Sequence, residues 1–145
     1  MGFPTELRGA AHAVLVAAVA AHPEWQVATI SSARPASAYP MHLWVDEVRF
    51  DVAHDSGTRQ WRGEVDVWAC YQAGDNEDGQ ARADAVLSGL LDAFDADPHW
   101  PDPDGLGNRV HEGTVRVRSG TVAVNAVEMP AYVVTLGDIY LQEGR

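Results

Sequence analysis

The sequence predicts an α+β domain, a mostly antiparallel sheet of about five strands with two helices packed on one face. Two segments repeat apolar residues at helical spacing, and several others alternate apolar and polar residues as half-buried strands do. The strand-like segments come in groups joined by turn residues, which is typical of antiparallel pairing. With 145 residues the chain has the length of one domain, so we expect residues 1–145 to fold as a single unit.

The first helix is expected to include Pro4 and to end at His22-Pro23. Proline suits the first turn of a helix, where its missing N–H is not needed, and Glu6 lies near the positive end of the helix dipole. Pro23 disfavours the α conformation at His22 and so ends the helix. The expected apolar stripe consists of Leu7, Ala11, Val14, Leu15, Ala18 and Val19.

The run AAHAVLVAAVAA, residues 10–21, also has the length and the small residues of a signal peptide. However, only Arg8 precedes it as a basic residue, Glu6 lies close by, and His12 interrupts the apolar run. The run is too short to span a bilayer. An amphipathic helix explains it better, so we expect a soluble, cytoplasmic product with no membrane partner.

A long antiparallel hairpin is expected after the Ser/Ala/Pro-rich connector of residues 31–40. Its first strand alternates apolar and charged residues over 48–52, and HDSG (residues 54–57) has turn chemistry. The second strand, residues 59–71, is the clearest in the chain. One row, expected to be buried, holds Trp61, Gly63, Val65, Val67, Ala69 and Tyr71. The other, mostly polar row holds Arg62, Glu64, Asp66, Trp68 and Cys70, beside Arg49 and Asp51.

The second helix is predicted to begin near Gly79 and to end before Pro98. Its core-facing residues are Ala83, Val86, Leu87, Leu90, Leu91 and Phe94. A proline- and glycine-rich loop, residues 97–108, follows it. Two or three Val- and Thr-rich strands complete the chain, with breaks expected at Ser119-Gly120 and Met129-Pro130.

The composition excludes two classes of site. A formal charge of −11 argues against binding nucleic acid through a clustered basic surface. The single cysteine, Cys70, excludes an intrachain disulfide and a zinc site built from cysteines.

The loop GDNEDG, residues 74–79, places three carboxylates between two glycines and so raises the question of a calcium site. An EF-hand loop that starts at Asp75 needs glycine at its sixth position and glutamate at its twelfth, but these positions hold Gln80 and Val86. We expect the loop to cap the second helix and to complement its dipole, through Asp75, Asn76, Glu77 and Asp78.

A second group of possible metal ligands consists of His99, Asp102, Asp104 and His111. Its spacing matches no compact ligand motif, and PDPDG within it is explained by consecutive turns. We therefore expect no metal site here.

No catalytic constellation is found in the sequence. Cys70 has no histidine near it along the chain, although a partner in space is left open. No serine lies in a G-x-S-x-G turn. Asp46 and Glu47 are adjacent along a strand, so they are expected to point to opposite faces and not to share a proton. We expect neither enzyme activity nor a cofactor.

Trp44 and Trp68 are candidates for an interface, because a tryptophan on an outward row often marks a contact surface. Burial preferences allow a second interpretation, in which segments of the same chain cover Trp68.

With this order of elements, the chain resembles the tail terminator (tail-completion) proteins of long-tailed bacteriophages. Four segments carry the likeness. LRGAAHAVLVAAVAAHPEW resembles their Ala-rich opening helix, and ARPASAYPMHLWVDEVRFD their Pro-rich entry into the first strand. WRGEVDVWACYQAGDNEDGQARADAVLSGLLDAF resembles their strand, polar loop and helix, and YVVTLGDIYLQEGR their closing strand. The 97–108 loop has no counterpart in the family pattern.

The resemblance implies a non-enzymatic virion protein that forms a ring, commonly a hexamer. Such a ring caps the head-proximal end of the tail tube and stops tube growth, and DNA passes through its lumen without specific binding. The implied partners are further copies of the chain, the tail tube protein and the head–neck connector or stopper protein. The implied location is the head-proximal end of the virion tail, after assembly in the host cytoplasm.

We expect heterologous contacts between ring subunits, in which two different patches meet. Besides the hairpin tip at 54–60, the candidate subunit-interface or lumen residues are Arg49, Asp51, Arg62, Glu64, Asp66, Trp68, Asp75, Glu77 and Asp78. Two alternatives stay open. The first is another neck component, such as a head-completion or stopper protein. The second is a small α+β enzyme or ligand-binding domain with a pocket between helices and sheet, which would need polar residues in the apolar row.

Overall fold

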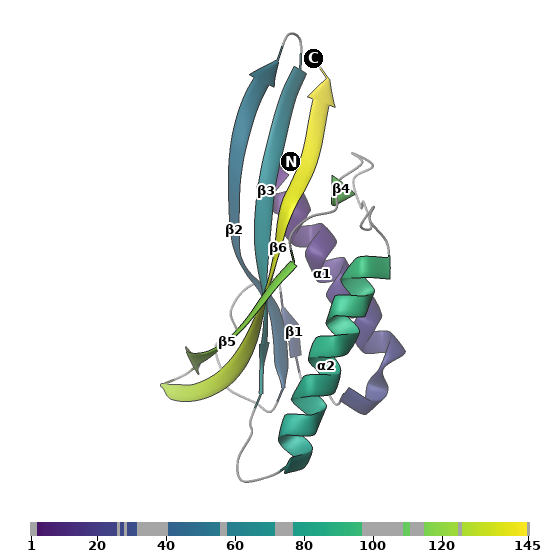
Figure 1. The fold of residues 1–145 in the computed structure, drawn as a ribbon, viewed down its shortest axis with the longest axis vertical. Helices are drawn as coiled ribbons and strands as arrows, with labels where there is room; N and C mark the ends of the chain where they lie inside the picture. Colours follow the sequence, from purple (N-terminus) through teal and green to yellow (C-terminus); the bar gives the residue numbers. More distant parts are fainter. Residues whose placement is uncertain are drawn as a thin grey trace.

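The computed structural model describes residues 3–25, 27, 29–31, 41–55, 58–71, 77–96, 109–110, 115–124 and 126–144. The helices are α1 (Phe3–Ala21), the short 3-10 helix η1 (Pro23–Trp25) and α2 (Glu77–Ala96). The strands are β1 (Thr29–Ser31), β2 (His42–Asp55), β3 (Thr58–Cys70), β4 (Arg109–Val110), β5 (Val115–Val124) and β6 (Val127–Gly144). The predicted α+β class is confirmed (Figure 1).

The described strands form one sheet in the order β1-β2-β3-β6-β4, and β5 also pairs with β6. Every pair is antiparallel except β1–β2, which is parallel. β4 lies opposite Ile139 and Tyr140, and β5 lies opposite residues 127–136. β4 and β5 therefore follow one another along the same edge of β6, and the predicted mostly antiparallel sheet is confirmed.

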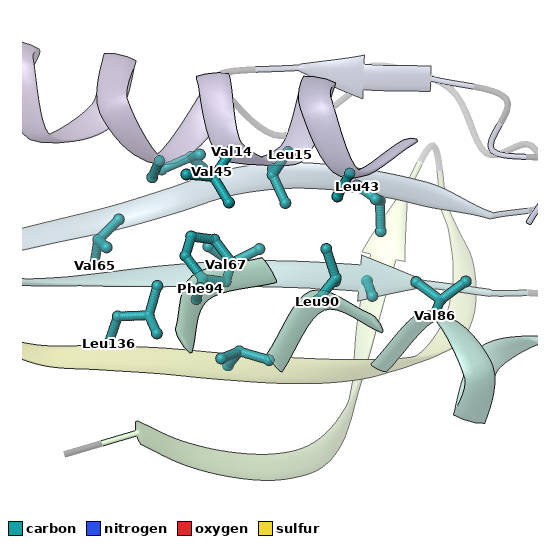
Figure 2. Close-up of a cluster of buried hydrophobic side chains, with 14 of the residues drawn as sticks. Val14, Leu15, Leu43, Val45, Val65, Val67, Val86, Leu90, Phe94 and Leu136 are labelled. Carbon is teal, nitrogen blue, oxygen red and sulfur yellow. The ribbon is translucent and has the colours of Figure 1, made fainter. Parts of the chain in front are cut away.

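Both helices lie against one face of the sheet, which we call the helix side (Figure 1). A single cluster of buried apolar side chains joins the two helices to the strands. In Figure 2, α1 contributes Val14 and Leu15 to this cluster, and α2 contributes Val86, Leu90 and Phe94. The labelled strand residues that meet them are Leu43, Val45, Val65, Val67 and Leu136. The apolar stripes predicted for the helices are therefore the surfaces that pack on the sheet.

The end of α1 leads directly into a close helix contact. α1 stops at Ala21, at the predicted proline boundary, and Pro23 begins η1. This short turn places Trp25 against α2 at Gly89, where a Cβ atom would lie 2.2 Å from Cζ2 of Trp25. The absence of a side chain at position 89 therefore permits the approach.

Two bulges interrupt the sheet at neighbouring levels. Residues 46–47 of β2 lie opposite Asp66 of β3, and residues 137–138 of β6 lie opposite Glu64. Each bulge adds one residue to one strand, which shifts the alternation of side chains by one and bends the strand. Just before the first bulge, Nη1 of Arg8 from α1 donates a hydrogen bond to the Val45 carbonyl at 3.0 Å.

The first bulge corrects the prediction for Asp46 and Glu47. Asp46 accepts a hydrogen bond from Nε1 of Trp44 at 3.1 Å, and an oxygen of Glu47 lies 3.1 Å from Nη1 of Arg49. Both partners belong to the row that faces away from the helices. The two carboxylates therefore lie on the same face of the sheet, because the bulge interrupts the regular alternation of side chains at this point.

The strand breaks expected at Ser119-Gly120 and Met129-Pro130 are wrong. β5 runs through the first and β6 through the second, and a turn residue, Ala126 with a φ of 62°, precedes β6. Pro130 fits within β6 because its carbonyl accepts the N–H of Tyr71 at 3.1 Å, so its nitrogen also faces the β3 side. The β5–β6 ladder loses no donor.

Smaller boundary differences concern the hairpin and α2. β2 extends to Asp55, so the residue pair 54–55, expected in the turn, belongs to the strand. α2 begins at Glu77 rather than near Gly79. Residues 32–40 of the connector and the whole 97–108 loop lie outside the described residues.

Candidate interaction surface on the face away from the helices

The face of the sheet opposite the helices, here called the polar side, collects charged residues from β2, β3 and β5. It forms because alternate residues of paired strands point to the same side. Six of the nine residues predicted for an interface or lumen share this face: Arg49, Asp51, Arg62, Glu64, Asp66 and Trp68.

Arg49 is at the centre of the charged group. Its Nη2 and Nη1 donate to the two carboxylate oxygens of Asp66 at 2.9 and 3.0 Å, and its Nε donates to Glu64. Glu47 adds a third carboxylate, 3.1 Å from Nη1. These bonds raise the pKa of Arg49 above its already high ordinary value, mainly through Asp66 and then Glu64. Arg49 is therefore a permanent positive charge held among three acids.

Asp66 is buried, yet it stays ionised. Burial by itself would raise the pKa of this carboxyl group, but hydrogen bonds from Arg49 and from the Thr135 hydroxyl (2.7 Å), together with the charge of Arg49, outweigh burial and lower it. At neutral pH neither Arg49 nor Asp66 is available to exchange a proton. The group is built as an electrostatic contact and not as an acid–base pair.

β5 brings two arginines to the same face. Nη2 of Arg116 lies 3.2 Å from a carboxylate oxygen of Glu64, and the guanidinium carbon of Arg118 lies 5.7 Å from the centre of the Trp68 ring. Sequence reasoning missed both arginines and Thr135. The alternation in VRVR at residues 115–118 contains a usable signal, since it places two arginines on one face of a strand.

Two open hollows lie on the polar side. One, of about 520 Å³, is lined by Arg49, Phe50, Asp51, Arg62, Gly63, Glu64, Arg116 and Gly137. The other, of about 680 Å³, is lined by Glu47, Arg49, Asp66, Arg116, Val117, Arg118 and Thr135. Residues of β2 and β5 line both hollows, together with charged side chains of β3. The surface is therefore concave and charged, unlike the apolar pockets that enclose most small ligands.

At the other end of the polar side, a second and smaller hydrophobic cluster covers the strands. Its buried members are Trp44, Cys70, Val122, Met129 and Ala131. Trp68 packs on it, stacked on the ring of Trp44 at 5.7 Å between ring centres. Residues of β5 and β6 thus cover the two tryptophans, which supports the interpretation that Trp68 is covered by its own chain.

Cys70 does have a histidine close in space. His42 lies directly across from it in the β2–β3 pair, and both residues are buried. Burial raises the pKa of the Cys70 thiol to about 11, and its sulfur lies 3.5 Å from that of Met129. The thiol is protonated at neutral pH, so Cys70 does not provide the thiolate that nucleophilic catalysis needs.

Two of the three predicted acidic residues of the loop, Glu77 and Asp78, belong to a helix and not to the strands of this surface. Glu77 and Asp78 are the first residues of α2, which packs on the helix side, and Asp75 lies outside the described residues. The capping role expected for the loop therefore stays a prediction. His99, Asp102, Asp104 and His111 also lie outside the described residues. Within the described segments, no group of three or more His, Cys, Asp or Glu is placed to hold a metal ion.

No helix in the described part of the chain combines the length and apolar character needed to cross a membrane. A comparison of the chain with models of known protein families finds no match, and a comparison with curated proteins finds no similar sequence.

Proposed function

We propose that this chain is a structural virion protein that forms a ring, with six subunits, at the head-proximal end of a phage tail tube. In this role it stops tube polymerisation and joins the tail to the head–neck connector. DNA crosses the lumen without specific binding. The proposal combines the resemblance to tail terminator proteins with the form of the sheet.

The observation that carries it is a projecting arm with exposed apolar side chains. The arm consists of residues 48–55 of β2, 58–63 of β3 and 139–144 of β6, and it extends beyond both helices (Figure 1). On its helix side Phe50 is 48% exposed and Val52 is 46% exposed, and Phe50 packs on Trp61. Neighbouring apolar groups on a projecting element favour a surface that another subunit covers.

The charged surface favours an assembly role over chemistry. Arg49 and Asp66 satisfy one another, and the thiol of Cys70 is buried and protonated. The chain's excess of acidic residues would also keep the phosphates of passing DNA from adhering. These features agree with a ring whose polar side lines or borders a channel.

The test combines solution mass with tube capping. Light scattering gives the mass of the purified chain, and electron microscopy follows tubes assembled from the tail tube protein of the same genome. The expected result is a ring on one end of each tube and shorter tubes as the chain is added. A strictly monomeric chain that leaves tube length and tube ends unchanged would contradict the proposal.

A neighbouring neck component, such as a stopper or head-completion protein, is the closest alternative. It would bind the connector and leave tube growth unaffected, so the same tube-length measurement separates the two roles. A ligand-binding domain with a pocket between helices and sheet is less well supported. Among the described residues, the buried polar side chains are His42, Asp66 and Thr135, and all three lie on the polar side.

A further inference from the structure

We propose that the chain associates with itself by strand addition, with β5 of one copy pairing along β2 of the next. The inference rests on the proposed ring-forming function and adds which strands meet. It starts from the two open edges of the sheet. β1 pairs only with residues 42–44 of β2, and β5 pairs with β6 on one side. Within the described residues, no strand lies beside the outer edge of β2 over residues 47–52 or beside the outer edge of β5.

These two edges also hold the exposed apolar side chains. Among the described residues, five large apolar side chains are exposed, and four of them belong to β2 and β5. They are Phe50 and Val52 on β2, and Val115 and Val117, 39% and 42% exposed, on β5. The fifth, Val16, lies on α1. An open strand edge with exposed apolar residues is a template for pairing with another chain.

The exposed apolar residues of the two edges point to the same face of the sheet. Val115 and Val117 lie opposite Leu136 and Val134, which belong to the helix-side core, so they point to the helix side. Phe50 and Val52 continue the row of Val48, which packs on the same core. A sheet continued from β5 to β2 therefore places all four exposed apolar residues on one face.

The charges on the opposite face are complementary. β5 carries Arg116 and Arg118 and no acidic residue. The facing stretch of β2 carries Glu47 and Asp51. Within one subunit Glu47, Glu64 and Asp66 already bind Arg49, and Glu64 also binds Arg116, so Arg118 and Asp51 carry most of the complementarity. Pairing β5 with β2 brings arginines next to acids, whereas pairing β5 with a second β5 brings arginines together. A second copy joined edge to opposite edge is therefore the favoured occupant.

The strand directions allow such contacts to repeat. β2, β3, β6 and β5 are each antiparallel to the next, so β5 runs antiparallel to β2 in the same subunit. Rotation about an axis to which the strands are tilted, as in a barrel, keeps neighbouring strands alternating in direction and offsets each copy along the strands. The ring needs this offset, because within one sheet Val115 lies level with Val48, and the rest of β5 runs away from Phe50 and Val52. β5 of one copy then meets β2 of the next as an antiparallel pair, and each copy keeps one edge of each kind, which a closed ring requires.

The first experiment compares charged substitutions at three apolar sites of similar exposure. Val52→Glu on β2 and Val117→Glu on β5 should each reduce the mass found by light scattering to that of a single chain. Val16→Glu on α1, where the exposure is 45%, should leave the mass unchanged. Circular dichroism melting confirms that each variant is folded. The self-association of each variant is measured for the chain alone in solution and again in the presence of tail tubes.

The second experiment tests which edges meet. A chain with both Val52→Cys and Val117→Cys, treated with a short bismaleimide, should give a ladder of covalent species beyond the dimer. A variant with only one of the two substitutions should give no covalent species larger than the single chain. Cys70, which is buried, is present in every variant. A covalent dimer from a single variant would show like edges meeting and would overturn the proposal.

The outcomes separate this inference from the proposed function. Tube capping that survives Val52→Glu and Val117→Glu would overturn strand addition and leave the terminator role in place. Self-association that depends on both edges, without tube capping, would support strand addition and contradict the terminator role. A wild-type chain that stays monomeric both alone and on tubes would overturn the inference.

Discussion

Arg49 of β2 and Asp66 of β3 form a two-pronged ion pair, with nitrogen–oxygen distances of 2.9 and 3.0 Å. The Asp66 side chain is 7% exposed, and that of Arg49 is 37% exposed. The pair crosses from β2 to β3 beside the bulge at residues 46–47. It therefore fixes a charged group at the point where the sheet bends.

Arg49→Met should lower the free energy of unfolding by about 1–3 kcal/mol, because it leaves the buried Asp66 carboxylate without its main partner. The partial exposure of Arg49 keeps the loss below that of a fully buried pair. Arg116→Met is the matched control, since Arg116 is mostly exposed and meets Glu64 alone among the described residues; its effect should stay within about 0.5 kcal/mol. Urea unfolding at a concentration where the chain is monomeric measures both. Equal losses would contradict this account of Asp66.

His42 should make stability depend on pH between neutrality and mild acid. Burial lowers the pKa of His42 below its ordinary value of 6.5, so the unfolded chain takes up a proton before the folded one does. The stabilisation is fully present above about pH 6.5 and is lost as pH falls toward the folded-state pKa, with a slope of at most about 1.4 kcal/mol per pH unit. Urea midpoints at pH 8, 7, 6 and 5 should decline less steeply in His42→Gln. An unchanged slope in that variant would assign the pH dependence to other groups.

The two helical glycines with described surroundings should respond to alanine in opposite ways. Gly9→Ala in α1 should stabilise the chain by about 0.5–1 kcal/mol, because no heavy atom of the surroundings lies within 4 Å of the new Cβ and alanine favours helix. Gly89→Ala in α2 should destabilise it by about 1–3 kcal/mol, because the new Cβ overlaps the Trp25 ring. Thermal melts of both variants provide the comparison. A higher melting temperature in Gly89→Ala would show that η1 moves away at little cost.

Tyr132 should titrate well above an ordinary tyrosine. Its hydroxyl donates to Asp84 of α2 at 2.6 Å, and this bond, with burial, raises the pKa of Tyr132 to about 12. The associated stabilisation is present below about pH 10 and is lost as pH rises through about 12. Absorbance at the tyrosinate band should show a late-titrating tyrosine that Tyr132→Phe removes. Asp84→Asn should move that step toward pH 10, and a late step that is unaffected by either change would exclude Tyr132 as its source.

The regular parts of the fold were predictable from the sequence because they follow simple periods. The two rows of β3 alternate between faces as predicted, and the apolar stripes of both helices recur at helical spacing. The residues of the apolar row and of the stripes are part of the buried core or pack against it. Single-residue irregularities do not follow a period. The bulge at 46–47 breaks a regular alternation, and Pro130 lies inside a strand where its missing N–H is harmless.

The candidate surface was predictable only in part, for a related reason. Arg49, Glu64 and Asp66 belong to one hairpin, so their shared face follows from local pairing. Arg116, Arg118 and Thr135 reach the same surface through β5–β6 pairing with β3, across long separations in the chain. The cover over Trp68 has the same origin. Such contacts depend on strand order, which composition and periodicity do not specify.

The bulge at residues 46–47 has a consequence for how this chain can diverge. Because residues 46 and 47 together lie opposite Asp66, deleting one of them would leave regular pairing and keep Phe50 and Val52 on the helix side. A single deletion between Val48 and Phe50 would instead turn Phe50 and Val52 toward the acids. A loss of one residue is therefore tolerable at the bulge, whereas elsewhere in this half of β2 it reverses the two faces unless a second change restores the phase. Related chains should therefore have either one or two residues between Val45 and Val48, and should keep the spacing within the Val48–Val52 row.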